Sequence, residues 1–210
     1  MGRNIGVYGS TGSIGTQTLE VARQLKNTRV AALACKSNAR LLLEQIKEFR
    51  PKYAAVIDET GAEWLKREAR ASGLKTEILH GEPGAIDACA ADEIEISVNA
   101  SVGIAGLVPS LQFIKRGKDL ALANKESLVA GGQLVIPAAR KAGITILPID
   151  SEPSAVFQCL QGSDKGSIEK LILTASGGPF RGRSSRELSS VTVAEALRHP
   201  TWKMGKRITG

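Results

Sequence analysis

Residues 4–15 read Asn-Ile-Gly-Val-Tyr-Gly-Ser-Thr-Gly-Ser-Ile-Gly, a short apolar run that leads directly into a turn with three glycines. An amphipathic pattern follows, so the order predicts a strand, a glycine-rich turn and a helix, as in dinucleotide-binding folds. We expect Gly9 to allow a sharp turn, Gly12 to let the backbone approach a diphosphate, and Gly15 to let the helix pack closely on the sheet. The alternative is a turn with a purely structural role.

The end of the second predicted strand, residues 28–34, bears on the kind of cofactor. Enzymes that use NAD usually place an Asp or Glu there to bind the ribose 2′-hydroxyl. This chain instead has Lys36, Ser37 and Asn38, followed by Arg40. Basic and hydroxyl side chains suit a 2′-phosphate, so the sequence favours NADP. The alternative is a solvated basic loop.

Strand and helix patterns alternate along the next hundred residues. Strands are expected at residues 53–57, 77–79, 95–99, 119–123 and 145–147, and helices at residues 39–49, 61–72 and 133–142. This alternation predicts an α/β fold with a doubly wound, mostly parallel, Rossmann-like sheet. Because the carboxyl ends of such strands face the ligand crevice, residues 99–103 should lie near the cofactor.

Polar clusters follow two of the later predicted strands. Asn124, Lys125 and Glu126 would face the same crevice, although Asn124 is equally suited to cap a helix. Asp150 and Glu152 follow the strand at residues 145–147, and on an extended backbone both carboxylates would project from one face. Such a pair is half of a site for a hard divalent cation. The alternative is that the pair caps a helix that starts near Ser154.

Beyond residue 150 the sequence predicts part of a second, α/β catalytic domain, so the expected domains are residues 1–149 and 150–210. It predicts a helix at residues 154–160, a strand at residues 168–174 that runs into a Ser-Gly-Gly turn, and a helix at residues 193–198. The segment from His199 to Gly210 combines a histidine, a tryptophan and several cations, and we interpret it as a mobile lid over a ligand.

The composition of the chain is typical of a soluble, folded protein. With 42% hydrophobic and 23% charged residues, the chain is expected to form a soluble folded protein. No apolar run approaches the roughly 18 residues that span a membrane, and the N-terminus leads straight into a strand, so we expect a cytoplasmic protein with no membrane partner. Cys35, Cys89 and Cys159 lack metal or redox spacing and are predicted to be small buried residues in a reducing compartment.

The net charge of +7 lies almost wholly in the last part of the chain. Residues 165–210 hold nine Lys or Arg and three Glu, whereas residues 1–164 hold nineteen basic and eighteen acidic residues. A basic segment suits nucleic acid or an anionic small molecule such as a sugar phosphate. Because Phe180 and Trp202 are its only aromatic residues, stacking on bases is disfavoured and no nucleic-acid partner is expected.

Five stretches together resemble the 1-deoxy-D-xylulose 5-phosphate reductoisomerase family, in the same order along the chain. They are Gly-Ser-Thr-Gly-Ser-Ile-Gly at residues 9–15, Leu-Ala-Asn-Lys-Glu-Ser-Leu-Val at 122–129, Ile-Asp-Ser-Glu at 149–152, Thr-Ala-Ser-Gly-Gly-Pro-Phe-Arg at 174–181 and His-Pro-Thr-Trp-Lys-Met-Gly at 199–205. The resemblance implies an NADPH- and metal-dependent enzyme that rearranges and reduces a phosphorylated ketose to 2-C-methyl-D-erythritol 4-phosphate in the non-mevalonate isoprenoid pathway. It also implies a homodimer.

The resemblance assigns roles to residues. Cofactor binding falls to Thr11, Gly12, Ser13, Ile14, Asn38, Asn124, Glu126 and Gly205, in addition to Gly9, Lys36 and Ser37 from the patterns above, and the cation (Mn²⁺, Mg²⁺ or Co²⁺) to Asp150 and Glu152. Substrate contacts fall to Lys125, Ser151, Glu152, Ser176, His199 and Trp202, of which Lys125, Glu152 and His199 are also implied to be catalytic. Trp202 and Met204 correspond to the flexible lid of the family.

Two departures from the family pattern bear on activity. Pro153 stands where the family usually has a histidine. The family pattern also continues past the position of Gly210 with a third metal-binding glutamate and a helical domain. Pro153 is expected to hold Glu152 in an extended conformation. An alternative to an active reductoisomerase is therefore an inactive NADP-binding fragment or interaction module.

Overall fold

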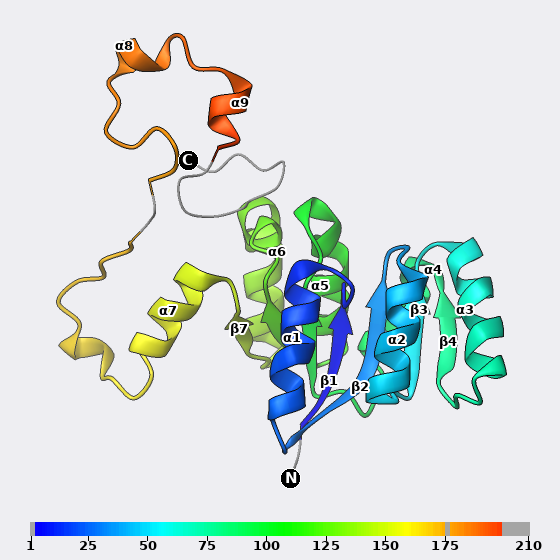
Figure 1. The fold of residues 1–210 in the computed structure, drawn as a ribbon. Helices are drawn as coiled ribbons and strands as arrows, with labels where there is room; N and C mark the ends of the chain where they lie inside the picture. The colour runs from blue at the N-terminus through cyan, green and yellow to red at the C-terminus, as the bar shows by residue number, and fades with distance from the viewer. Residues whose placement is uncertain (1–2, 175–176, 199–210) are drawn as a thin grey trace. The chain divides into compact units, whose positions relative to one another are not determined.

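The computed structural model describes residues 3–174 and 177–198. The chain divides into two compact units, Met1–Ser154 and Ala155–Gly210. In the first unit, strands and helices alternate from β1 (Arg3–Tyr8) to β7 (Ile146–Pro148) (Figure 1). The α/β class predicted from the sequence is confirmed.

The first unit contains one seven-stranded sheet in the order β4-β3-β2-β1-β5-β6-β7, and every neighbouring pair is parallel. The strands between β1 and β7 are β2 (Thr28–Cys35), β3 (Tyr53–Val56), β4 (Glu77–His80), β5 (Ile96–Asn99) and β6 (Asp119–Leu122). Strands are added outward on one side of β1 up to β4 and on the other side from β5 onward. This is the predicted doubly wound topology, and it opens a crevice at the carboxyl ends of β1 and β5.

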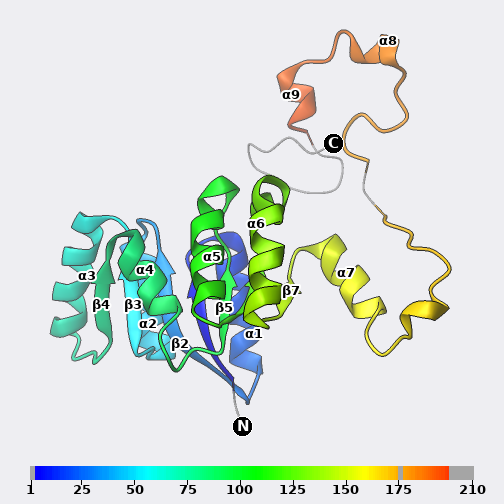
Figure 2. The ribbon, with the colours of Figure 1, turned by 180° about the vertical axis from the view of Figure 1, so that it is seen from behind.

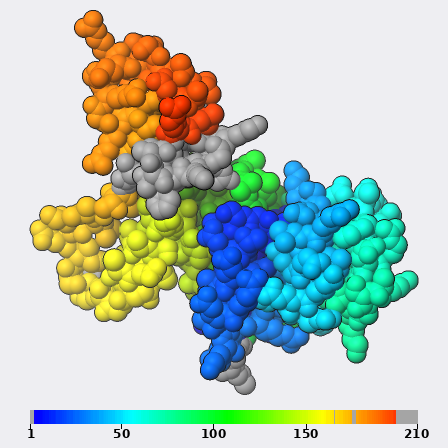
Figure 3. Space-filling model, viewed as in Figure 1, coloured from blue at the N-terminus to red at the C-terminus, as the bar shows by residue number. Residues whose placement is uncertain are grey.

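Three helices cover the face of the sheet turned to the viewer in Figure 1: α1 (Ser13–Gln24), α2 (Ala39–Phe49) and α3 (Glu59–Ala71). Each places its apolar stripe on the strands, where Leu19, Leu42 and Leu65 are almost completely buried. Figure 3 shows α1 and α2 side by side on this surface, where the guanidinium of Arg23 pairs with the Glu48 carboxylate (Nη2 to Oε2, 3.0 Å).

The opposite face is covered by α4 (Gly81–Cys89), α5 (Leu107–Lys115) and α6 (Glu126–Ala142) (Figure 2). Phe113, Ile114 and Val135 fill the second apolar layer. The sequence had not predicted α4 or α5, and α6 begins at Glu126 rather than at residue 133. Gly131 departs from helical geometry (φ −133°), and the helix resumes beyond it.

Residues 155–174 and 177–198 contain helical segments and no strand. They are the greater part of α7 (Ser151–Cys159), a short 3-10 turn η2 (Lys165–Ser167), α8 (Ser185–Leu188) and α9 (Val193–Ala196). The prediction of a strand at residues 168–174 is therefore wrong. A strand needs a neighbour for its backbone hydrogen bonds, and Leu171, Ile172 and Leu173 here are 61–74% exposed. Among all the residues the structure describes, no helix is both long and apolar enough to cross a membrane.

Candidate functional site

The glycines of the turn between β1 and α1 meet different steric demands. Gly9 has φ +89°, and a Cβ at Gly15 would lie 2.2 Å from the Gly9 carbonyl oxygen. The predicted role of Gly9 is confirmed. Gly15 does allow close packing of the helix, but the backbone that it approaches is that of the turn at Gly9 and Ser10 and not that of the sheet. At Gly12 the φ is −81° and the nearest atom to an added Cβ is 3.3 Å away. The backbone angle and the packing therefore require glycine less strictly here than at Gly9 and Gly15. The approach of Gly12 to a diphosphate stays a prediction.

The N-terminus of α1 is open to an anion. Gly12 is the N-cap residue and no side chain caps the helix, while Gly12, Ser13 and Ile14 are all exposed. The first amides of a helix lack intrahelical acceptors and carry the positive end of its dipole. The Gly12 amide donates to the Gly9 carbonyl oxygen (3.0 Å), so the backbone donors offered to a diphosphate at this surface are those of Ser13 and Ile14.

A buried glutamine clamps this turn to α2. The Ser10 hydroxyl donates to Gln45 Oε1 (2.8 Å), and Gln45 Nε2 donates to the Ser10 carbonyl oxygen (2.9 Å). Both residues are at most 5% exposed. This contact was not predicted from the sequence, although a polar residue between Leu42 and Ile46 on an otherwise apolar helix face is a signal that could have indicated it.

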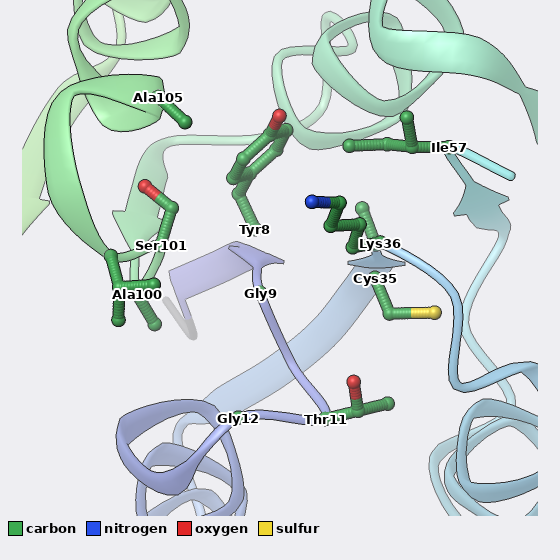
Figure 4. Close-up of a pocket in the computed structure, with 12 residues that line it drawn as sticks. Tyr8, Gly9, Thr11, Gly12, Cys35, Lys36, Ile57, Ala100, Ser101 and Ala105 are labelled. Carbon is green, nitrogen blue, oxygen red and sulfur yellow. The ribbon is translucent and has the colours of Figure 1, made fainter. Parts of the chain in front are cut away.

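A cleft of about 270 Å³ opens at the carboxyl ends of the central strands. Its walls come from the ends of β1, β2 and β3 and from the loop after β5, as Figure 4 shows. The lining residues include Tyr8, Thr11, Gly12, Lys36, Ile57 and Ser101. The cleft thus joins the glycine turn, the predicted 2′-phosphate loop and part of the segment 99–103 that the sequence placed beside a cofactor.

The loop after β5 is held by the side chain of Asn99, which is fully buried. Its Nδ2 donates to the Gly106 carbonyl oxygen (2.9 Å) and to Ser110 Oγ (2.8 Å). Its Oδ1 accepts from the amide and the hydroxyl of Ser101 (3.2 and 2.6 Å). Every polar atom of this amide is therefore used to shape one wall of the cleft.

Asn124 supports the same loop from β6. Its Nδ2 donates to the carbonyl oxygens of Ser101 (3.1 Å) and Gly103 (2.8 Å), and its Oδ1 accepts from the Ser127 amide (3.0 Å). The last contact caps the first turn of α6, which is one of the two interpretations that the sequence left open. Asn124 is 1% exposed, and cofactor binding by it and by the half-buried Glu126 stays a prediction.

The residues at the end of β2 separate into lining and supporting groups. Lys36 lines the cleft and Ser37 is exposed, whereas Asn38 Oδ1 caps α2 by accepting from the Leu41 amide (3.2 Å). The guanidinium of Arg40 lies over the Trp64 ring, 5.8 Å from its centroid. Of the four polar side chains predicted here, Lys36 is the one placed directly in the cleft wall.

The three cysteines differ in burial. Burial raises the pKa of the Cys35 thiol to about 12, against the smaller opposing effects of hydrogen bonds with Thr11 and Asn38, so this cleft residue is a neutral thiol near pH 7. Cys35 and Cys89 are buried as predicted. Cys159 is exposed, so the prediction is wrong for this residue, which lies on a helix with no buried side chain.

Lys125 and Asp150 form an ion pair that the sequence did not predict. Lys125 Nζ lies 3.0 and 3.2 Å from the two carboxylate oxygens of Asp150. The two residues follow β6 and β7, which are adjacent parallel strands, so their side chains meet at the same sheet edge. A cation bound by Asp150 would share or displace this ammonium group.

The predicted extended backbone through Asp150 and Glu152 is wrong. α7 begins at Ser151, and the Asp150 carbonyl oxygen accepts from the Ser154 amide (2.9 Å), so Glu152 lies in the first helical turn. Pro153 does not hold Glu152 extended, because proline is tolerated in a first turn, where amides need no intrahelical acceptor. The two carboxylates therefore do not share a face by strand alternation. The helix that was expected to start near Ser154 starts three residues earlier, at Ser151.

The remaining predicted site residues are partly outside the described residues. Ser151 is exposed at the start of α7. Ser176, His199, Trp202, Met204 and Gly205 lie outside the residues that the structure describes. Within residues 3–174 and 177–198, no group of three or more His, Cys, Asp or Glu side chains is placed to hold a metal ion.

Comparison with known families decides which family this arrangement belongs to. The model of 1-deoxy-D-xylulose 5-phosphate reductoisomerase matches residues 5–132, and that of the C-terminal domain of the same enzyme matches residues 146–210. The chain belongs to the 1-deoxy-D-xylulose 5-phosphate reductoisomerase family. The resemblance found in the five sequence stretches is thereby confirmed.

The similarity to curated reductoisomerases covers almost the whole of this chain. That of Lachnoclostridium phytofermentans is 52% identical over 206 residues, which are 98% of this chain and 52% of the relative. The chloroplastic reductoisomerase of Oryza sativa subsp. japonica is 50% identical over 206 residues, covering 98% of this chain and 44% of the relative. The chain thus spans about half the length of the curated reductoisomerases that it matches.

Solved reductoisomerase structures share the fold. The Zymomonas mobilis enzyme in complex with NADPH superposes with a TM-score of 0.86 at 39% identity, over 95% of this chain and 52% of that one. A reductoisomerase in complex with NADPH, fosmidomycin and magnesium gives a TM-score of 0.84 at 40% identity, over 97% of this chain and 52% of that one.

Proposed function

We propose that residues 1–210 form the NADPH-binding part, and contribute the first metal-binding carboxylates, of a 1-deoxy-D-xylulose 5-phosphate reductoisomerase. The observation that carries the proposal is the cleft at the reversal of strand order, where the glycine turn meets Lys36 and the loop held by Asn99. We further propose residues 1–149 as the NADP-binding domain and residues 150–210 as part of the catalytic domain.

The choice of NADPH rests on the end of β2. Where an NAD-binding protein would place a carboxylate, this chain has Lys36 in the cleft wall and Ser37 exposed beside it. A cation and a hydroxyl are suited to the 2′-phosphate that distinguishes NADPH from NADH. The diphosphate would lie at the amides of the exposed residues Ser13 and Ile14, against Gly12 and next to Gly9 and Thr11.

The divalent cation would be held by Asp150 and Glu152, whose oxygen donors suit Mg²⁺, Mn²⁺ or Co²⁺. When bound, it supplies Lewis-acid activation of substrate oxygens. Lys125, which contacts Asp150, is placed to carry positive charge toward an anionic ketose phosphate. We propose that Ser151, Ser176 and His199 contact the substrate, and that Trp202 lies in a closing lid together with Met204 and Gly205.

Two properties of the whole protein belong to the same proposal. Reductoisomerases of full length are expected to act as homodimers on a sugar phosphate. A cytoplasmic location also stays a prediction, because the rice relative is chloroplastic by name whereas other relatives are bacterial.

Turnover tests the reductoisomerase proposal. We expect residues 1–210 alone to bind NADPH without oxidising it in the presence of 1-deoxy-D-xylulose 5-phosphate and Mn²⁺, because the relatives are about twice as long. A chimaera that joins residues 1–210 to the remaining half of the Lachnoclostridium phytofermentans relative should oxidise NADPH. Asp150→Asn in that chimaera should lower turnover at least about 100-fold, because the cation would lose a charged ligand.

NADPH absorbance follows the reaction directly, and NADPH binding by the chimaera is the control for correct folding. A chimaera that binds NADPH but does not turn over substrate, with either Pro153 or Pro153→His, would refute catalysis. The chain would then be an NADP-binding module without reductoisomerase activity.

A further inference from the structure

Tyr8 is the last residue of β1 and immediately precedes the glycine turn. Its side chain is 5% exposed, and its ring packs edge-on against Phe113 with the ring centroids 5.9 Å apart. Figure 4 shows the ring standing in the cleft between Ala105 and Ile57, with the hydroxyl at the end away from the strand. The ring is thus fixed by the core while the phenolic oxygen faces ligand space.

The Tyr8 hydroxyl has no partner among the residues that the structure describes. Within residues 3–174 and 177–198 this hydroxyl makes no hydrogen bond. Every side-chain nitrogen or oxygen there that is sealed from solvent does make a hydrogen bond. The oxygen therefore borders the cleft rather than the closed core. Buried tyrosines usually find a hydrogen-bond partner, and a phenylalanine would fill the same space and keep the contact with Phe113. Because the oxygen borders the cleft, its partner is supplied from the cleft, by water or by a bound ligand.

The chemistry of this group is that of a neutral donor. Burial raises the pKa of Tyr8 far above its usual range, and the carboxylate of Glu82 raises it further, so the phenol stays protonated at neutral pH. The position of the Tyr8 hydroxyl indicates which part of a bound dinucleotide it would contact. Lys36 and Ile57, at the ends of β2 and β3, share its cleft, and in doubly wound folds the adenosine ribose lies at the end of the second strand.

We propose that the Tyr8 hydroxyl donates a hydrogen bond to an acceptor on the adenosine half of the bound dinucleotide, which makes Tyr8 a further cofactor-binding residue. The inference rests on the proposed binding of NADPH in this cleft. The proposed Tyr8 contact is made by a side chain, whereas the neighbouring glycine turn offers backbone groups to the cofactor.

Tyr8→Phe tests the contact, with Tyr53→Phe as the matched control. Tyr53 is half-buried at the first residue of β3, at the opposite end of the strands, with its ring against the Lys52 ammonium (4.9 Å). Losing one hydrogen bond should weaken both NADPH and 2′,5′-ADP about 5-fold in Tyr8→Phe. Tyr53→Phe should bind both ligands as the wild type does, and both variants should unfold near the wild-type temperature.

Tyrosine NMR provides a readout that does not depend on a variant. The chain has two tyrosines, so protein labelled with ¹³C at the tyrosine Cζ atoms gives one signal for Tyr8 and one for Tyr53. Addition of 2′,5′-ADP should shift the Tyr8 signal and leave the Tyr53 signal in place.

Four results would count against the inference. Unchanged affinity of Tyr8→Phe for 2′,5′-ADP, or weakening of NADPH alone, would overturn the adenosine contact while leaving the proposed function intact. A Tyr8 signal that does not move at saturating 2′,5′-ADP would do the same. Failure of the wild-type chain to bind NADPH at all would overturn the proposed cofactor site and this contact together.

Discussion

Gly15→Ala is expected to abolish measurable NADPH binding and to destabilise the protein by about 3 kcal/mol. The added methyl group would lie 2.2 Å from the Gly9 carbonyl oxygen and 2.5 Å from Ser10 Cα, both of which are backbone atoms. They cannot rotate away as a side chain does, so α1 must move off the turn. The movement would displace the amides at the helix N-terminus, and urea unfolding with a fluorescence titration of NADPH measures both effects.

Gly132→Ala is the matched control for this substitution. Gly132 lies in α6, and a Cβ there would meet nothing within 4 Å. Alanine is the better helix former by up to about 1 kcal/mol, so this variant should be slightly more stable and bind NADPH normally. If Gly15→Ala were as stable as the wild type, the turn and α1 would not be packed as closely as the 2.2 Å approach requires.

Asn99→Ala is expected to cost about 3 kcal/mol of stability and to weaken NADPH binding. The substitution leaves the buried Gly106 carbonyl and Ser110 hydroxyl, and the two part-buried donors of Ser101, without their partner. Each unmet group of this kind costs roughly 1–3 kcal/mol, of which entering water recovers a part. The loop would then no longer hold Ser101 in the cleft wall.

Asp58→Ala gives the comparison for a polar contact at the surface. Asp58 caps α3 by accepting from the Gly61 amide (2.7 Å), and loss of such a cap costs about 1 kcal/mol. Urea unfolding of the two variants should therefore give a clearly larger loss for Asn99→Ala. Equal losses would mean that the Asn99 contacts do not organise the loop.

Local patterns were sufficient to predict most of the sheet. The apolar runs that became β1, β2 and β3 are separated by helices with clear amphipathic stripes, and α2 was predicted with its observed bounds. α4 escaped prediction because Gly81, Pro83 and Gly84 lie in nine residues and its buried side extends around much of the helix. At residues 168–174 an apolar, β-branched run resembled a strand, but pairing depends on a neighbour that local sequence does not specify.

The candidate site, like the fold, was predicted from local sequence only in part. The roles of Gly9 and Gly15 follow from the chain on either side of them, so their positions in a strand-turn-helix unit were enough. The Gln45 clamp and the Lys125–Asp150 ion pair join residues 25 or more positions apart, and they follow from helix docking and strand order. Glu152 was misjudged because the helix starts at Ser151, where the side-chain period changes from 2 to 3.6.

That residues 1–210 form an NADPH-selective binding fold is tested most directly by titrating the wild-type chain with NADPH and with NADH. Because Lys36 is placed for a charge-assisted contact with the 2′-phosphate, NADPH should bind about 10-fold tighter than NADH, and Lys36→Glu should remove the preference. NADH binding as tight as NADPH, or no saturable binding of either dinucleotide, would contradict the assignment.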